Sequence, residues 1–211
     1  MHNHLEEFTS ELKEIAFILH TMSEIATGKK EALEVKTISS TDLTIYLKLA
    51  PAVAACVAHA VEKIIGIYKQ LLEIKKLNSE LRKQGVPQER TAGVEDYANS
   101  VMKEGIEKIS IEIINRFEKV KGDKGRKNEL HNGLRISLNK IANRIDKGFH
   151  IEIRCEPLPE TQDESKKDKE KSDHLAVVQK ATAQLQFFKF EGEPILQLPE
   201  SNSKPKQEKS S

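Results

Sequence analysis

The sequence predicts an α+β fold that is mostly helical, in which a bundle of long helices carries a small antiparallel sheet and a tethered C-terminal segment. Three observations predict it. Apolar residues recur at helical spacing over four long stretches, short alternating stretches flank a turn, and a polar stretch with prolines interrupts the pattern after residue 156. We expect the element order α-β-β-α-α-α-β. We place a helical α+β domain at 1–156, a disordered linker at 157–172, a C-terminal interaction segment at 173–199 and a disordered tail at 200–211.

The first predicted helix runs from the N-terminus to about Ala26. Its apolar residues lie three or four positions apart, as in a short heptad seam: Leu5, Phe8, Leu12, Ile15, Leu19 and Met22. Gly28 and the two lysines after it suit a helix C-terminus. A seam of this length can pack inside its own domain or against a partner helix, and the sequence leaves both open.

A β-hairpin is expected next, because residues 33–37 and 43–49 both alternate between apolar and polar side chains. Between them, Ser39-Ser40-Thr41-Asp42 favours a turn through side-chain hydrogen bonds to the main chain.

The central helix is predicted from Ala52 to Leu81, with Pro51 in its first turn and a stop at Gly85. Its apolar stripe comprises Val53, Val57, Val61, Ile64, Ile65, Tyr68, Leu71 and Leu72, continued by Leu77 or Leu81. The stretch 43–61 is long and apolar enough to invite comparison with a membrane span, which needs about 20 residues. Because its first part alternates like a strand and contains Pro51, we expect a buried spine and no integral membrane insertion.

Two further long helices are predicted, at Val94–Val120 after a loop at Thr91–Val94, and at Arg126–Lys147 with Gly148 as its cap. The strict alternation of Phe149–Arg154 predicts a third strand beside the hairpin. Beyond the linker, we expect a short amphipathic helix at Asp173–Phe188 and an extended stretch at Pro194–Pro199.

Composition narrows the function classes only modestly. The 211 residues carry a net charge of +1, so no global excess of charge favours nucleic acid or membrane. The two cysteines lie far apart, and Cys56 is expected to be a small buried hydrophobe. The N-terminus shows no basic region followed by an apolar core, so we expect a cytoplasmic protein.

No motif for catalysis or cofactor binding is recognised, and we predict no catalytic, cofactor-binding or metal-ligating residue. The seven histidines include no pair at i and i+4 with the acidic neighbour of a zinc protease. No phosphate-binding glycine loop or nucleophile elbow occurs. His59 lies near the apolar stripe of the central helix, where a hydrogen-bonded, partly buried histidine is expected.

Residues 119–147 form a local basic region, with nine Lys or Arg residues against three acidic ones. Asparagines and one arginine of its helix share a polar stripe, which could read base edges, hydrogen-bond across a helix interface or face water. The candidate nucleic-acid-binding residues are Lys124, Arg126, Lys127, Asn128, Asn132, Arg135, Asn139 and Asn143.

Three functions follow from these patterns. The first is a non-enzymatic interaction or assembly protein, either an oligomer or an adaptor, that uses helical seams and the tethered C-terminal segment. Its candidate partner-binding residues are Leu175, Val178, Leu185, Phe188, Ile195 and Leu196. The second is a nucleic-acid-binding regulator acting through residues 119–147, and the third is an enzyme or toxin with an unrecognised site. Whether the interaction segment at 173–199 docks on its own chain or on another chain is left open.

Overall fold

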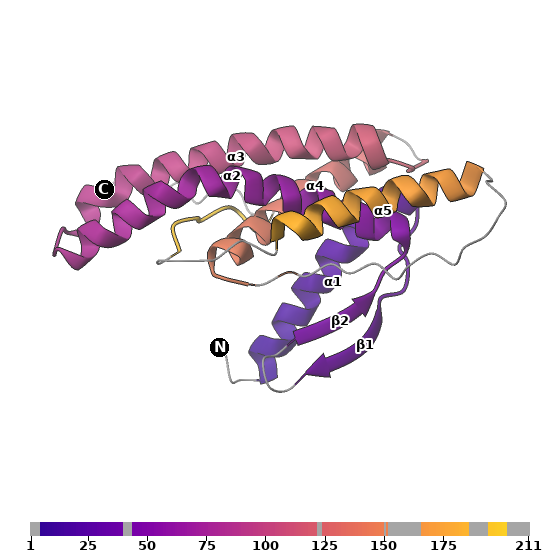
Figure 1. The fold of residues 1–211 in the computed structure, drawn as a ribbon, viewed down its shortest axis with the longest axis horizontal. Helices are drawn as coiled ribbons and strands as arrows, with labels where there is room; N and C mark the ends of the chain where they lie inside the picture. Colours follow the sequence, from indigo (N-terminus) through magenta and orange to yellow (C-terminus); the bar gives the residue numbers. More distant parts are fainter. Residues whose placement is uncertain are drawn as a thin grey trace.

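The computed structural model describes residues 5–39, 44–121, 124–149, 151, 166–185 and 194–201. Within them the chain is predominantly helical with one two-stranded antiparallel sheet, so the predicted fold class is confirmed. The elements in chain order are α1 (Leu5–Thr27), β1 (Glu34–Ser39), β2 (Thr44–Lys48), α2 (Pro51–Lys83), α3 (Gln88–Phe117), α4 (Lys124–Asp146) and α5 (Lys166–Leu185). Figure 1 shows α2 and α3 side by side as a long helical hairpin, with α5 lying along α2.

The central helix α2 is the spine that the sequence predicts. Pro51 opens it, and Gly85 follows its end at a φ of 82°, which an L side chain rarely adopts. The predicted apolar stripe is buried from Val53 to Leu71, whereas Leu77 is 55% exposed. The helix is also long and apolar enough to cross a membrane by length and composition, but 61% of its most apolar window is buried, as in a core helix.

Helix α1 packs against α2 and α4 through its C-terminal half, so its seam contributes to the core of its own domain. Met22 and Ile25 are fully enclosed, while Phe8, Leu12 and Ile15 are half-buried. The main-chain N–H of Lys119 donates to the carbonyl of Ile25 over 2.8 Å, which ties the end of α3 to α1.

The predicted hairpin is confirmed, but the third strand is not. In the hairpin Glu34 pairs with Lys48, with an irregularity after Val35. Phe149 and Ile151 belong to no strand, and the other residues of that prediction lie outside the described part. At the first predicted residue the reason is local: Phe149 donates its N–H to the carbonyl of Arg144, and Gly148 donates to Ile145, so these two residues form the C-terminal cap of α4.

Three helices begin earlier than predicted. The predicted loop Thr91–Val94 lies inside α3, which begins at Gln88 directly after Pro87. Helix α4 begins at Lys124, where Arg126 was predicted. Helix α5 begins at Lys166, within the stretch predicted as disordered linker, and its first turns are rich in lysine, which is a good helix former. Residues 157–165 and Phe188 lie outside the described residues.

Candidate functional site

Residues Pro194–Glu200, here called the C-terminal segment, cross α3 and α4 in an extended form that belongs to no sheet. In Figure 1 this yellow stretch lies beside the C-terminal end of α4. Ile195, Leu196 and Leu198 are almost fully buried, whereas Gln197 faces solvent. A single extended segment without strand neighbours must find other partners for its main-chain groups.

The first partner is Asp146 at the end of α4. Its Oδ2 atom accepts the main-chain N–H groups of Ile195 and Leu196 over 2.6 and 2.7 Å. Its Oδ1 atom accepts from the Tyr68 hydroxyl over 2.6 Å and from Lys75 Nζ over 2.9 Å. The carboxylate is therefore completely buried yet holds four hydrogen bonds and a counter-ion.

Lys75 is enclosed as fully as its partner, with a side chain that is 1% exposed. Besides the carboxylate, its Nζ donates to the Tyr68 hydroxyl over 2.6 Å and to the main-chain carbonyl of Asp146 over 2.9 Å, so all three ammonium protons are used. Burial, followed by the hydrogen bond to Asp146, raises the pKa of Tyr68, which keeps its hydroxyl protonated.

Two asparagines bind the next residues of the segment. Asn99 of α3 accepts the N–H of Gln197 over 2.7 Å, and its Nδ2 lies 3.4 Å from the carbonyl of Ile195. Asn143 of α4 accepts the N–H of Leu198 over 3.1 Å and donates to the carbonyl of the same residue over 2.9 Å. The four consecutive N–H groups from Ile195 to Leu198 therefore all donate to side chains of the helices.

Glu200 ends the segment among buried cations. Its Oε1 accepts from Asn143 Nδ2 over 2.8 Å, and its Oε2 lies 3.7 Å from Lys140 Nζ and 3.8 Å from Arg144 Nη1. The two basic side chains are only 7% and 11% exposed. We call the side chains that hold the C-terminal segment the seat; they are Asn99, Asn139, Lys140, Asn143, Arg144 and Asp146.

The predicted asparagine stripe is divided by this arrangement. Asn139 donates to the carbonyl of Pro199 over 2.8 Å, and Asn143 is 4% exposed beneath the segment. Asn128 and Asn132, at the other end of α4, are exposed. Half of the stripe thus contacts polypeptide of the same chain.

The basic candidates for nucleic-acid binding are for the most part paired with carboxylates. Arg126 bonds to Glu24 over 2.5 Å, Arg135 bonds to Glu107 over 2.9 Å, and Lys127 lies 3.8 Å from a carboxylate oxygen of Glu118; Lys124 is exposed. These pairs do not test the nucleic-acid prediction, but they give the charges an alternative use within the fold.

Four of the six candidate partner-binding residues have described side chains, and all four pack against their own chain. Val178 of α5 is 2% exposed in the core beside α2, and Leu175 is half-buried. Ile195 and Leu196 occupy the seat. The side chain of Leu185 is not described, and Phe188 lies outside the described residues.

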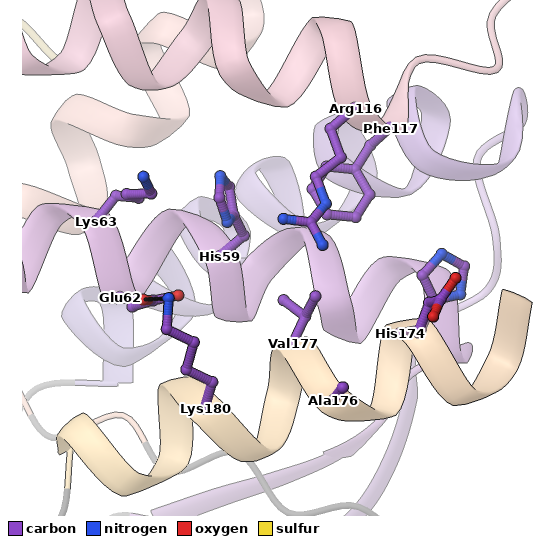
Figure 2. Close-up of a pocket in the computed structure, with 10 residues that line it drawn as sticks. His59, Glu62, Lys63, Arg116, Phe117, His174, Ala176, Val177 and Lys180 are labelled. Carbon is purple, nitrogen blue, oxygen red and sulfur yellow. Dashed lines mark ion pairs between the residues drawn. The ribbon is translucent and has the colours of Figure 1, made fainter.

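A second feature is an open cavity of about 580 Å³ between α2, α3 and α5. Figure 2 shows His59, Phe117 and His174 along it, with Glu62 joined to Lys180 over 2.9 Å. The ring of Phe117 lies between the two imidazoles, at 5.8 and 6.4 Å between centroids.

His59 is buried, where a partly buried histidine was predicted, and its Nε2 lies 3.3 Å from a carboxylate oxygen of Glu112. Burial, then the nearby Arg116 and Lys63, lower the pKa of His59, so the imidazole is neutral near pH 7. Lys63 also pairs with Glu112, over 3.0 Å. Within the described ranges, no group of three or more His, Cys, Asp or Glu side chains could hold a metal ion.

Sequence reasoning missed five residues as parts of a site: Lys75, Asn99, Lys140, Arg144 and Asp146. A signal for Lys75 existed, because it follows Leu71 by four positions and so continues the buried stripe of α2 with a charge. A lysine at such a position needs a buried partner. Nothing in the local pattern marks Asn99.

The comparisons with known proteins supply no relative for this arrangement: no family model matches the chain, and no significant match to a curated protein or to a solved structure was found.

Proposed function

We propose that this protein is a non-enzymatic interaction protein that binds extended polypeptide segments of a partner at the seat. One observation carries the proposal: four consecutive main-chain N–H groups of an extended segment donate to helix side chains. Recognition through the main chain is how peptides are bound by strand addition, where hydrogen bonds give affinity and pockets give specificity. Here side-chain amides and a carboxylate take the place of the strand.

The net free energy that holds the C-terminal segment in the seat is small, which favours its replacement by a partner segment. Burying three apolar side chains contributes about 2 kcal/mol each. Two charge-assisted hydrogen bonds to Asp146 contribute about 2 kcal/mol each and the two to asparagines about 1 kcal/mol each. Ordering the seven residues of the segment opposes this by about 1.5 kcal/mol each. The net is a few kcal/mol at most, so the C-terminal segment is held by contacts weak enough for a competitor to replace them.

The short connection between α5 and the C-terminal segment determines which variant the binding test must use. Residues 186–193 connect the segment to α5, and a short connection gives an effective concentration in the millimolar range. A competing peptide in trans would have to exceed that concentration with the native chain. We therefore use the full chain carrying Leu196→Asp and Leu198→Asp, which places two carboxylates at buried apolar positions and frees the seat.

The measurement is fluorescence anisotropy of a labelled peptide with the sequence of residues 194–201. We expect saturable binding to the double variant and much weaker binding to the native chain. The matched controls are two peptides with one N-methyl group each. Methylation at Leu198 removes a donor to Asn143 and should abolish binding. Methylation at Glu200, whose N–H forms no hydrogen bond with a described residue, should leave binding intact.

Two results would contradict the proposal. One is absence of peptide binding by a double variant whose circular dichroism and unfolding transition show a folded chain. The other is equal binding of the two methylated peptides, because that would mean that the main chain is not recognised. The single variant Leu198→Pro, which removes the same donor with a smaller disturbance, replaces the double variant if the latter does not fold.

A further inference from the structure

We infer that the seat selects a partner segment with the pattern apolar-apolar-any-apolar-any-acidic, with free N–H groups at its first four positions. This inference rests on the proposed function and names the ligand of the same site. The occupant is a segment of a partner protein, for which the C-terminal segment stands in within this chain.

The apolar positions follow from burial. Ile195, Leu196 and Leu198 are 2%, 5% and 5% exposed, so a polar side chain at any of them would lose water without gaining a partner. Gln197 is exposed and carries no side-chain requirement. The prolines of the C-terminal segment flank the four N–H donors, at positions outside that run of main-chain contacts to the seat.

The acidic position follows from charge. Lys140 and Arg144 are nearly buried beneath Glu200, and Asn143 donates to its other oxygen. Both cations also pair with carboxylates of α1, Lys140 with Glu14 and Arg144 with Glu11. These pairs hold the cations in place when no segment is bound. A carboxylate at the last position is therefore attracted to fixed charges, while a lysine at this partly exposed position would lie beside two cations.

The test uses the full chain carrying Leu196→Asp and Leu198→Asp, with a set of labelled peptides based on residues 194–201. Gln197→Lys in the peptide should change the dissociation constant less than twofold. Leu198→Lys should abolish binding. Glu200→Gln should weaken binding about fivefold, the size of one partly exposed ion pair, and Glu200→Lys about thirtyfold.

A seat variant separates specificity from stability. With Lys140→Met added to the double variant, the ratio of affinities for the native peptide and the Glu200→Gln peptide should fall to about twofold, while affinity for the Glu200→Gln peptide stays the same. A residue that only supports the fold would weaken both peptides alike. Arg144→Met serves the same purpose if Lys140→Met does not fold.

The possible results distinguish failure of the proposed function from failure of the ligand pattern. If no peptide binds, the proposed function fails and the pattern with it. If the native peptide binds but the Glu200 and Leu198 substitutions change nothing, the pattern is wrong and the proposed function stands. If light scattering finds the unmodified chain as a dimer that the native peptide dissociates, the natural occupant is a second copy and the assignment to a partner is overturned.

Discussion

Replacing Asp146 by asparagine tests the centre of the site with almost no change in shape. The substitution removes the counter-ion of Lys75, a cation with a 1% exposed side chain. An amide also carries one acceptor where the carboxylate uses two, so either the two N–H groups of the C-terminal segment or the Tyr68–Lys75 pair must face an NH2 group. Leaving one partner of a buried ion pair unpaired costs about 3–5 kcal/mol.

We therefore expect Asp146→Asn to lower the free energy of unfolding by about 4 kcal/mol, a large part of the 5–15 kcal/mol typical of a domain. Urea unfolding followed by circular dichroism measures it. With a slope of about 2 kcal/mol per molar urea, the midpoint should fall by about 2 M. The matched control is Asp96→Asn on the exposed face of α3, which should stay within about 0.5 kcal/mol of the native chain.

A double-mutant cycle sharpens this expectation. Lys75→Met alone leaves Asp146 with three donors, from Tyr68 and the C-terminal segment, so its loss should be smaller, about 2 kcal/mol. The combination of Asp146→Asn with Lys75→Met removes both charges and should lose less than the sum of the single changes. The reasoning would be refuted by a loss under about 1 kcal/mol for Asp146→Asn, or by strictly additive effects.

Three further predictions use thermal or chemical unfolding and thiol labelling. Asn143→Ala should lower stability by about 2 kcal/mol, because buried main-chain groups of the C-terminal segment lose their partner, whereas Asn128→Ala on the exposed half of the stripe should change it by less than about 0.5 kcal/mol. Burial raises the pKa of Cys56 to about 12, so in a Cys155→Ser variant a disulfide reagent at pH 8 should label the native chain no faster than it unfolds; labelling on mixing would contradict this. The pKa of His59 is lowered from 6.5 in the folded chain, chiefly by burial. The unfolded chain therefore binds a proton at His59 more readily than the folded chain does. As a result, the free energy of unfolding should fall as the pH drops from about 6.5 through the folded pKa. His59→Gln should flatten that part of a plot of urea midpoint against pH, and an unchanged plot would refute the assignment.

Much of the fold could be predicted because local physics decides it. The alternation of the hairpin and the buried stripe of α2 are properties of short stretches, and so are the stops at Gly28, Gly85 and Gly148, all at positive φ. The predicted starts of α3 and α5 are several residues too late, because the first turns of both helices are mostly polar and show no apolar residues at helical spacing. The third strand was predicted from the alternation of Phe149–Arg154, but its first residue, Phe149, belongs to the C-terminal cap of α4.

The site could be predicted only in part, for a different reason. The sequence singled out Asn139 and Asn143 as costly for a helix unless they have a use, and it predicted an extended stretch at Pro194–Pro199. The sequence could not show that the asparagines contact the extended stretch, because Asn143 and Leu198 are 55 positions apart and no local pattern joins them. The same holds for the network of Asp146, whose hydrogen-bond partners come from α2 and from the C-terminal segment.

The asparagines have a use that follows from helix geometry. The main-chain N–H and C=O groups within a helix already hydrogen-bond to one another. A helix can therefore bind the main chain of an extended segment only through side chains such as amides and carboxylates. The pairing of Asn143 with both the N–H and the carbonyl of Leu198 reproduces the two-bond exchange between antiparallel strands.

The spacing of the seat also matches the segment that it holds. From Asp146 to Asn139 the helix rises about 10 Å, at about 1.5 Å per residue. From Ile195 to Pro199 an extended chain covers about 13 Å, and about 10 Å from Leu196, at about 3.3 Å per residue. Over these seven helical steps the two lengths therefore agree, with the extended chain running antiparallel to the helix. An asparagine stripe that looks suited to base edges is for this reason equally suited to a peptide main chain, and here Asn139 and Asn143 hold one.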